Sequence, residues 1–144
     1  MNDYRNHVYR LMLAASRCTS VYKKIAKEQG VKENTLLFMD ILSDGKQHSQ
    51  KQICEDWMIP RTTLNTIVTE CMQDGYIILL SQNQSKEKLI ALTDKGKCFA
   101  ETITRAMNTA VQNAMRKITE ESGTDFIRVF EQYVEYLQEE YKNI

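Results

Sequence analysis

The sequence of 144 residues lacks the long apolar runs and leader patterns that define membrane and secreted proteins. No run of about 18 or more apolar residues occurs, so a membrane-spanning helix is not expected. The first residues, MNDYRNHVYRLML, show no basic start followed by a long apolar run and a small-residue cleavage site. We therefore expect a cytoplasmic protein that does not bind membranes.

Cysteine and histidine are few and widely spaced. Cys18, Cys54, Cys71 and Cys98 form no CxxC pair, and only two histidines accompany them, so no metal site is predicted. In a reducing compartment we expect buried or incidental thiols. The alternative is oxidant sensing by Cys18 or Cys98, which would require an exposed thiolate.

The sequence also lacks catalytic motifs and an excess of charge. No phosphate-cradling glycine loop, paired-acid motif or nucleophile with a matching base is present, so no enzymatic activity, catalytic residue or cofactor is predicted. The 19 basic and 19 acidic residues cancel, which argues against non-specific binding of polyanions. A nucleic-acid-binding protein of this composition must place its basic groups locally.

Proline and glycine are scarce, with one and five residues, and the segments between them have helical periodicity. We predict helices at about residues 3–29, 32–42, 49–57, 60–73, 94–118 and 119–141, with residue 124 as an alternative start for the last one. Thr93 is expected to cap the fifth helix. Two short β-rich runs, residues 76–80 and 88–92, flank a polar segment and predict a hairpin. The expected fold is mainly α with a small β-hairpin.

The segment from Ser49 to Ile77 predicts two short helices joined by a tight turn. Ser49 and Gln52 match an S-x-x-Q capping box, and Pro60 suits the first turn of the second helix. One apolar stripe of the second helix consists of Leu64, Ile67, Val68, Cys71 and Met72. The opposite face begins with five residues that include no acid: Arg61, Thr62, Thr63, Asn65 and Thr66. Such a helix suits insertion into a DNA major groove.

The long helices at the two ends have more apolar surface than a small middle part can cover. The side chains expected to face inward from the first helix are Val8, Leu11, Met12, Ala15, Tyr22, Ile25 and Ala26. Because burial of apolar surface contributes about 25 cal/mol per Å², packing of these helices against a second copy is expected. The sequence therefore predicts a homodimer.

The order of these elements resembles the MarR family of winged helix-turn-helix transcriptional regulators along essentially the whole chain. Residues 89–96, LIALTDKG, resemble the family's segment between the winged hairpin and the next helix, and residues 53–77 resemble its helix-turn-helix and first wing strand. The resemblance implies one MarR-like domain, 1–144. Its winged helix-turn-helix DNA-binding part would be 32–96, and the dimerisation helices would lie in 1–30 and 97–144.

Two features depart from the family pattern. Wings of this family commonly present an Asp-x-Arg arrangement, whereas residues 84–88 read QSKEK, and Lys86 offers a point charge opposed by Glu87 rather than a planar guanidinium. Cys18 lies about one or two turns beyond the position of the reactive cysteine in the peroxide-sensing branch. That sensing role is therefore not transferred to Cys18.

Candidate contacts with double-stranded DNA follow from these patterns. Arg61 is assigned to a guanine and Asn65 to an adenine edge, because each side chain offers the matching bidentate geometry. The other candidate DNA-binding residues are Thr62, Thr63, Thr66, Gln50, Lys51, Asn34, Thr35, Lys86 and Lys88. A ligand pocket between the long helices and the DNA-binding part is expected to involve Arg17, Tyr22, Met39 and His48.

We therefore predict a sequence-specific DNA-binding transcriptional regulator, a repressor, that binds a pseudo-palindromic operator as a homodimer. The resemblance implies half-sites roughly 34–36 Å apart and release by a small aromatic or phenolic effector. Two alternatives remain open. The zero net charge and the altered wing suit a winged-helix protein-interaction module without DNA binding, and the cysteines suit a thiol-based oxidant-sensing regulator.

Overall fold

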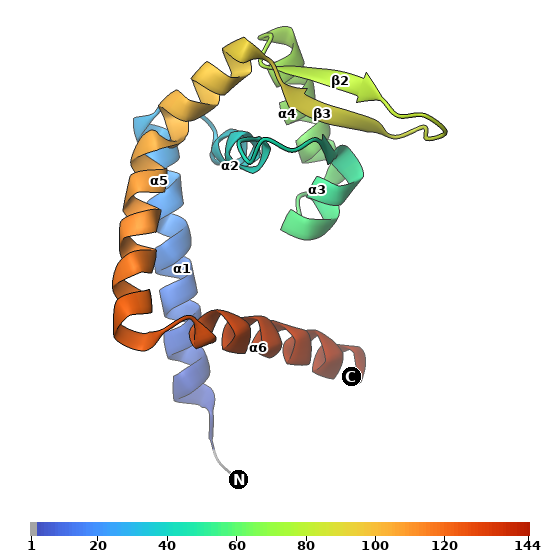
Figure 1. Cartoon of the computed structure of the whole chain (residues 1–144). Coiled ribbons are helices and arrows are strands. Elements are labelled where there is room, and N and C mark those ends of the chain that lie inside the picture. The colour runs from blue at the N-terminus through green and yellow to red at the C-terminus, as the bar shows by residue number, and fades with distance from the viewer. Residues whose placement is uncertain (1–2) are drawn as a thin grey trace. The chain divides into compact units, whose positions relative to one another are not determined.

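The computed structural model describes residues 3–144, which form six helices and a small antiparallel sheet (Figure 1). The helices are α1 (Arg5–Glu28), α2 (Glu33–Leu42), α3 (Gln50–Trp57), α4 (Arg61–Gln73), α5 (Asp94–Ser122) and α6 (Asp125–Lys142). The strands are β1 (His48–Ser49), β2 (Ile77–Ser81) and β3 (Lys88–Leu92). The predicted mainly α fold with a hairpin is confirmed. The chain divides into two compact units, residues 1–107 and 108–144.

Two details of the predicted elements were wrong. A third strand, β1, pairs with β3 through His48 opposite Ile90 and Ser49 opposite Leu89, giving the order β1-β3-β2. A strand of two residues is too short to leave a periodic pattern. The fifth helix also continues beyond residue 118 until Gly123, whose φ of +71° ends it. The last helix therefore begins at Asp125, close to the alternative start rather than at residue 119.

The core of the first unit is built from one side of each short helix and from the sheet. Its largest fully buried side chains come from α2, α3, α4 and β3, and they are Leu36, Phe38, Met39, Ile53, Leu64 and Ile90. Helix α5 adds Ala100, Ile103 and Met107. The predicted stripe of α4 is confirmed for Leu64, Ile67, Val68 and Cys71 but not for Met72, which is 44% exposed.

The apolar stripes of the outer helices remain largely uncovered within one chain. On α1 only Ala26 is buried, and Val8 and Met12, which were expected to face inward, are 43% and 59% exposed in the single chain. The second unit contains α6, which has no buried residue. Its exposed apolar side chains include Phe126, Val129, Phe130, Tyr136, Leu137 and Tyr141.

The start of α5 is joined to the root of the hairpin by close contacts. The Oγ1 atom of Thr93 donates to the Gly75 carbonyl at 2.6 Å and accepts from the Gly96 amide at 3.0 Å, so Thr93 caps α5 as predicted. A Cβ atom on Gly96 would lie 1.8 Å from the carbonyl oxygen of Tyr76. The Tyr76 ring stacks on Phe99 with centroids 4.1 Å apart. These contacts explain why the segment TDKG, residues 93–96, has a threonine at its first position and a glycine at its last.

Candidate functional site

Helix α3, the first helix of the helix-turn-helix, begins at a capping residue and ends at a left-handed one. The Ser49 Oγ atom accepts a hydrogen bond from the Gln52 amide at 3.0 Å, which confirms the predicted cap of α3. The reciprocal half of the capping box does not form, because the Gln52 side chain donates to Asp56 at 2.7 Å. After α3, Met58 adopts φ +51°, and Pro60 lies just before α4 in an extended conformation rather than in its first turn.

Helix α4 presents its polar residues to solvent at its N-terminal end. Arg61, Thr62, Asn65 and Thr66 are exposed, and Thr63 is half-buried. The Thr66 hydroxyl donates to the Thr62 carbonyl at 3.2 Å, which occupies its hydrogen within the helix. No hydrogen-bond or ion-pair partner for the Arg61 guanidinium occurs among residues 3–144. Arg61 is therefore available to an external acceptor.

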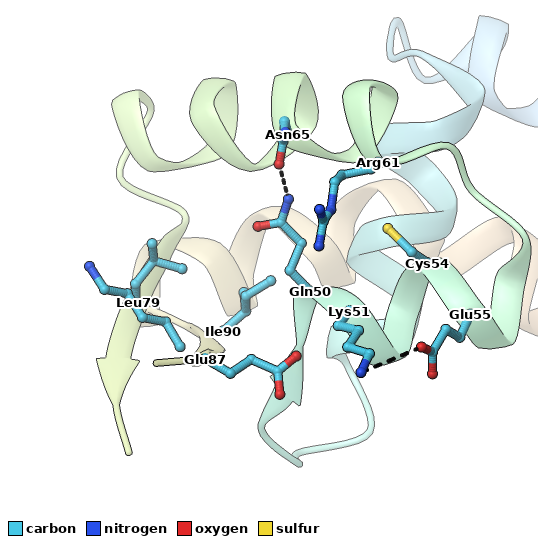
Figure 2. Close-up of a pocket in the computed structure, with 10 residues that line it drawn as sticks. Gln50, Lys51, Cys54, Glu55, Arg61, Asn65, Leu79, Glu87 and Ile90 are labelled. Atoms are coloured by element: carbon cyan, nitrogen blue, oxygen red, sulfur yellow. Dashed lines mark hydrogen bonds and ion pairs between the residues drawn. The ribbon is translucent and has the colours of Figure 1, made fainter. Parts of the chain in front are cut away.

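A cleft of about 640 Å³ lies between α3, α4 and the hairpin strands (Figure 2). We call it the recognition cleft. Its lining residues are Gln50, Lys51, Cys54 and Glu55 from α3, Arg61 and Asn65 from α4, and Leu79, Glu87, Lys88 and Ile90 from the hairpin. The fold thus brings together five of the side chains that the sequence assigned separately to DNA contact: Gln50, Lys51, Arg61, Asn65 and Lys88.

Two amides meet within the recognition cleft. The Nε2 atom of Gln50 donates a hydrogen bond to Oδ1 of Asn65, marked by a dashed line in Figure 2. This bond leaves the Asn65 amide nitrogen as a donor and the Gln50 carbonyl oxygen as an acceptor. A donor beside an acceptor is complementary to the N7 and N6 edge of adenine in the major groove.

The charges around the recognition cleft are mixed. Lys51 lies 3.9 Å from Glu55, and both side chains are exposed, so this pair contributes little to stability. The Oε1 atom of Glu87 is buried and has no hydrogen-bond partner among residues 3–144. Arg61 and Lys88 add positive charge that the two carboxylates partly offset.

The remaining candidate DNA contacts lie outside this cleft. Lys86 is exposed in the hairpin loop, next to the turn in which Gln84 has φ +65°. Asn34 and Thr35 belong to the first turn of α2, and Asn34 lines a hollow of about 280 Å³ together with Thr63 and Thr66. The fold therefore places Asn34 beside α4 and Lys86 in the loop of the hairpin.

A second cleft, of about 330 Å³, lies between α1, α2, the end of α3 and Met107 of α5. We call it the acidic cleft. Its lining residues are Cys18, Thr19, Tyr22, Glu33, Asn34, Leu36, Leu37, Asp40, Trp57 and Met107. Every one of them belongs to the first unit.

Of the four ligand-binding candidates, the structure places Tyr22 on the acidic cleft. Met39 is fully buried in the core, and His48 pairs with Asp44 at 2.9 Å at the start of the sheet. Arg17 is exposed on α1. Sequence reasoning missed Asp40, although an aspartate inside the apolar run LLFMDIL was a signal that could have found it.

Burial controls the ionisation of the acidic cleft. It raises the pKa of the Asp40 carboxyl above its ordinary value, and it raises the pKa of Tyr22, with smaller contributions from Cys18 and Asp40. The Asp40 carboxylate has no hydrogen-bond or ion-pair partner among residues 3–144. The wall of the cleft thus carries the Asp40 carboxylate, whose charge is disfavoured by burial and is not balanced by a neighbouring cation.

The four thiols differ in exposure. Cys71 is 3% exposed, and burial, followed by the charges of Asp74 and Glu70, raises its pKa to about 11. Cys54 is half-buried, whereas Cys18 and Cys98 are exposed. Residues 3–144 hold no group of three or more metal-ligating side chains and no helix long and apolar enough to cross a bilayer.

Comparison with known proteins shows the fold. No family model matches the sequence, and no curated protein matches it. A MarR family regulator from Neisseria meningitidis superposes with a TM-score of 0.80 at 19% identity, over 99% of both chains. MepR from Staphylococcus aureus in its DNA-binding conformation gives 0.77 at 13% identity, over 91% of this chain and 98% of that one.

A third structure, Staphylococcus aureus MarR in complex with salicylate and kanamycin, gives a TM-score of 0.70 at 16% identity, over 94% of this chain and 93% of that one. The chain therefore has the winged-helix fold of MarR family regulators, which the resemblance in sequence predicted.

Proposed function

We propose that this chain is a sequence-specific DNA-binding transcriptional regulator of the MarR type, a repressor that acts as a homodimer and is released by a small molecule. The observation that carries the proposal is the meeting of Gln50, Arg61, Asn65 and Lys88 at one cleft of a winged helix-turn-helix. The fold is shared with MepR, whose structure was solved in a DNA-binding conformation.

In this proposal α4 enters the major groove with its N-terminal end. Arg61, which has no partner within the described chain, donates to a guanine, and the Gln50–Asn65 pair contacts an adenine. Lys51, Lys86 and Lys88 bind phosphates and set the position of the subunit on the duplex. Because phosphate contacts carry no direct sequence information, most of the sequence preference comes from α4.

A homodimer is supported by the uncovered apolar stripes of the outer helices. Val8 and Met12 on α1 and Phe130 and Leu137 on α6 are each at least 43% exposed in the single chain. A second copy would cover them, and two-fold symmetry would then place two α4 helices on half-sites roughly 34–36 Å apart. Sedimentation equilibrium measures the assembly directly, and a monomer at micromolar concentration would contradict it.

The acidic cleft supports a ligand response because it lies against the helix-turn-helix. Trp57, the last residue of α3, lines this cleft, whereas Gln50 and Lys51 at the start of the same helix line the recognition cleft. A small aromatic compound bound beside Trp57 would therefore contact the DNA-binding part without an intermediary. Ligand complexes are known in this fold, as for NadR with 4-hydroxyphenylacetate.

The deciding experiment selects binding sequences from a random duplex pool and measures affinity for the enriched site across a salt series. We expect a two-fold symmetric site and an affinity that falls steeply with salt, because phosphate contacts release counterions. The Arg61→Ala variant should lose the preference, and Arg116→Ala, in the second unit, should keep it. No enrichment and no salt dependence would contradict the proposal and favour a protein-interaction module.

A further inference from the structure

The acidic cleft has the size and lining of a small-molecule site with one sign of charge. Its volume of about 330 Å³ is at the lower end of the range of ligand pockets, about 300–1,000 Å³. Leu36, Leu37 and Met107 provide apolar contact, and Tyr22 and Trp57 provide aromatic surfaces. The charged groups in the lining are carboxylates.

Asp40 is the group in this cleft that most needs a partner. It lies on α2 between core residues, is half-buried, and has no hydrogen-bond or ion-pair partner among residues 3–144. Buried carboxylates are costly unless they are paired. The raised pKa of Asp40 has burial as its cause, and no neighbouring cation lowers it.

Cations are missing from the lining of the acidic cleft. The ten lining residues include Glu33 and Asp40 and contain no lysine, arginine or histidine. A carboxylate or phenolate ligand would bring a second negative charge beside Asp40 in a partly desolvated site, where like charges repel strongly. The cleft therefore disfavours aromatic acids, which are anionic near neutral pH.

The aromatic residues favour the opposite charge. The tyrosine and indole rings at the wall, Tyr22 and Trp57, have electron-rich faces that attract ammonium groups within about 6 Å. Trp57 is 51% exposed, so its ring is free to contact a ligand. A cation bound here would satisfy Asp40 and contact apolar and aromatic surface at the same time.

We propose that the acidic cleft binds a small organic ammonium ion with an aromatic group, whose positive charge pairs with Asp40 and whose ring packs against Trp57 and Leu37. This inference rests on the proposed function only in taking the cleft as the effector site. It replaces the phenolic effector that the sequence suggested with a positively charged aromatic ligand.

The direct test measures binding to the full-length protein in the absence of DNA. Trp57 is the single tryptophan of the chain, so a saturable change in its fluorescence reports occupation of this cleft, and calorimetry gives an independent affinity. The probes are benzyltrimethylammonium, its uncharged isostere neopentylbenzene, and salicylate. We expect the ammonium ion to bind at least tenfold more tightly than either of the other two.

Variants then identify the countercharge. Asp40→Asn keeps the shape and removes a desolvated charge, so it should fold, and it should weaken the ammonium affinity at least tenfold. Glu33→Gln should weaken it less, and Glu28→Gln, at the exposed end of α1, should leave it unchanged. Equal affinity for the ammonium ion and its isostere, tighter binding of salicylate, or an unchanged affinity in Asp40→Asn would overturn the proposal.

Failure of this proposal is distinguishable from failure of the proposed function. The fluorescence and calorimetric affinities are independent of any DNA, so a protein that binds the ammonium ion but no operator keeps the ligand assignment and loses the regulator. A protein that binds an operator but prefers salicylate keeps the regulator and loses the ligand class.

Discussion

The recognition cleft and the acidic cleft are neighbours in one unit of the chain, yet they present different charges. The first, about 640 Å³, is lined by Lys51, Arg61 and Lys88 against two carboxylates. The second, about 330 Å³, is lined by Glu33 and Asp40 and by no cation among its ten lining residues. A net charge of zero therefore conceals two surfaces suited to different partners. What a protein binds depends on where its charges are placed and less on their sum.

The largest expected effect comes from a backbone contact that lies outside both clefts and supports the fold that carries them. Gly96→Ala would place a Cβ atom 1.8 Å from the Tyr76 carbonyl oxygen, at the junction of the hairpin root and α5. We expect a loss of more than about 4 kcal/mol in the free energy of unfolding, or failure to fold, because backbone must move. Urea unfolding measures this loss.

Gly45→Ala is the matched control for that substitution. Gly45 has φ +77° with nothing within 4 Å of an added Cβ, so only the left-handed conformation penalises alanine, by about 1–2 kcal/mol. Equal losses for the two variants would mean that the Tyr76 contact does not govern the fold.

The second effect separates the clefts. Arg61→Ala should weaken binding to the selected operator by about 1–3 kcal/mol and relax the preference at one base position, while ammonium binding in the acidic cleft stays unchanged. Lys86→Ala, the control in the hairpin loop, should weaken all sequences alike and reduce the salt slope by about 1. A uniform loss across sequences for Arg61→Ala would assign Arg61 to phosphate instead.

A smaller effect concerns the amide pair. Gln50→Ala removes the hydrogen bond to Oδ1 of Asn65 and should cost about 0.5–1.5 kcal/mol of operator affinity, concentrated at one adenine. Comparison of the parent and the variant on operators with each base at that position measures it. The same small loss at every base would show that the pair does not read sequence.

The smallest effect is one of pH and belongs to the acidic cleft. Because the folded pKa of Asp40 is raised above 3.8, the folded state binds its proton more tightly than the unfolded state, so ionisation costs stability. The free energy of unfolding of the parent should therefore fall relative to Asp40→Asn as pH rises from about 3.8 through the raised pKa. Urea unfolding of both proteins between pH 3.5 and 6.5 checks this, and a parallel pH dependence would contradict it.

The sequence predicted elements better than it predicted which elements meet. The stripe of Leu64, Ile67 and Val68 and the caps at Ser49 and Thr93 are local patterns, so periodicity and hydrogen-bonding chemistry were enough. The exposed positions of α1 could not be resolved in the same way, because an apolar stripe predicts burial without identifying the surface that covers it.

The two clefts also show that sequence predicts elements better than it predicts which elements meet. Gln50, Lys51, Arg61 and Asn65 were found because the two helices that carry them follow each other in one short stretch of sequence, whereas the acidic cleft draws on three helices and Met107. Asp40 and Tyr22 are on different helices, and only the tertiary packing places both on one wall. The only local sign of the acidic cleft in the sequence was Asp40, a single carboxylate within an apolar run.

Helix α3 is eight residues long, which at about 1.5 Å per residue makes a rod of roughly 12 Å. The Ser49 cap marks one end and the left-handed Met58 the other. A ligand that shifts Trp57 by a fraction of an ångström would tilt the rod and displace Gln50 at its far end by a similar amount. Hydrogen bonds to base edges tolerate little such misalignment. A small displacement of Gln50 would therefore be enough to weaken DNA binding.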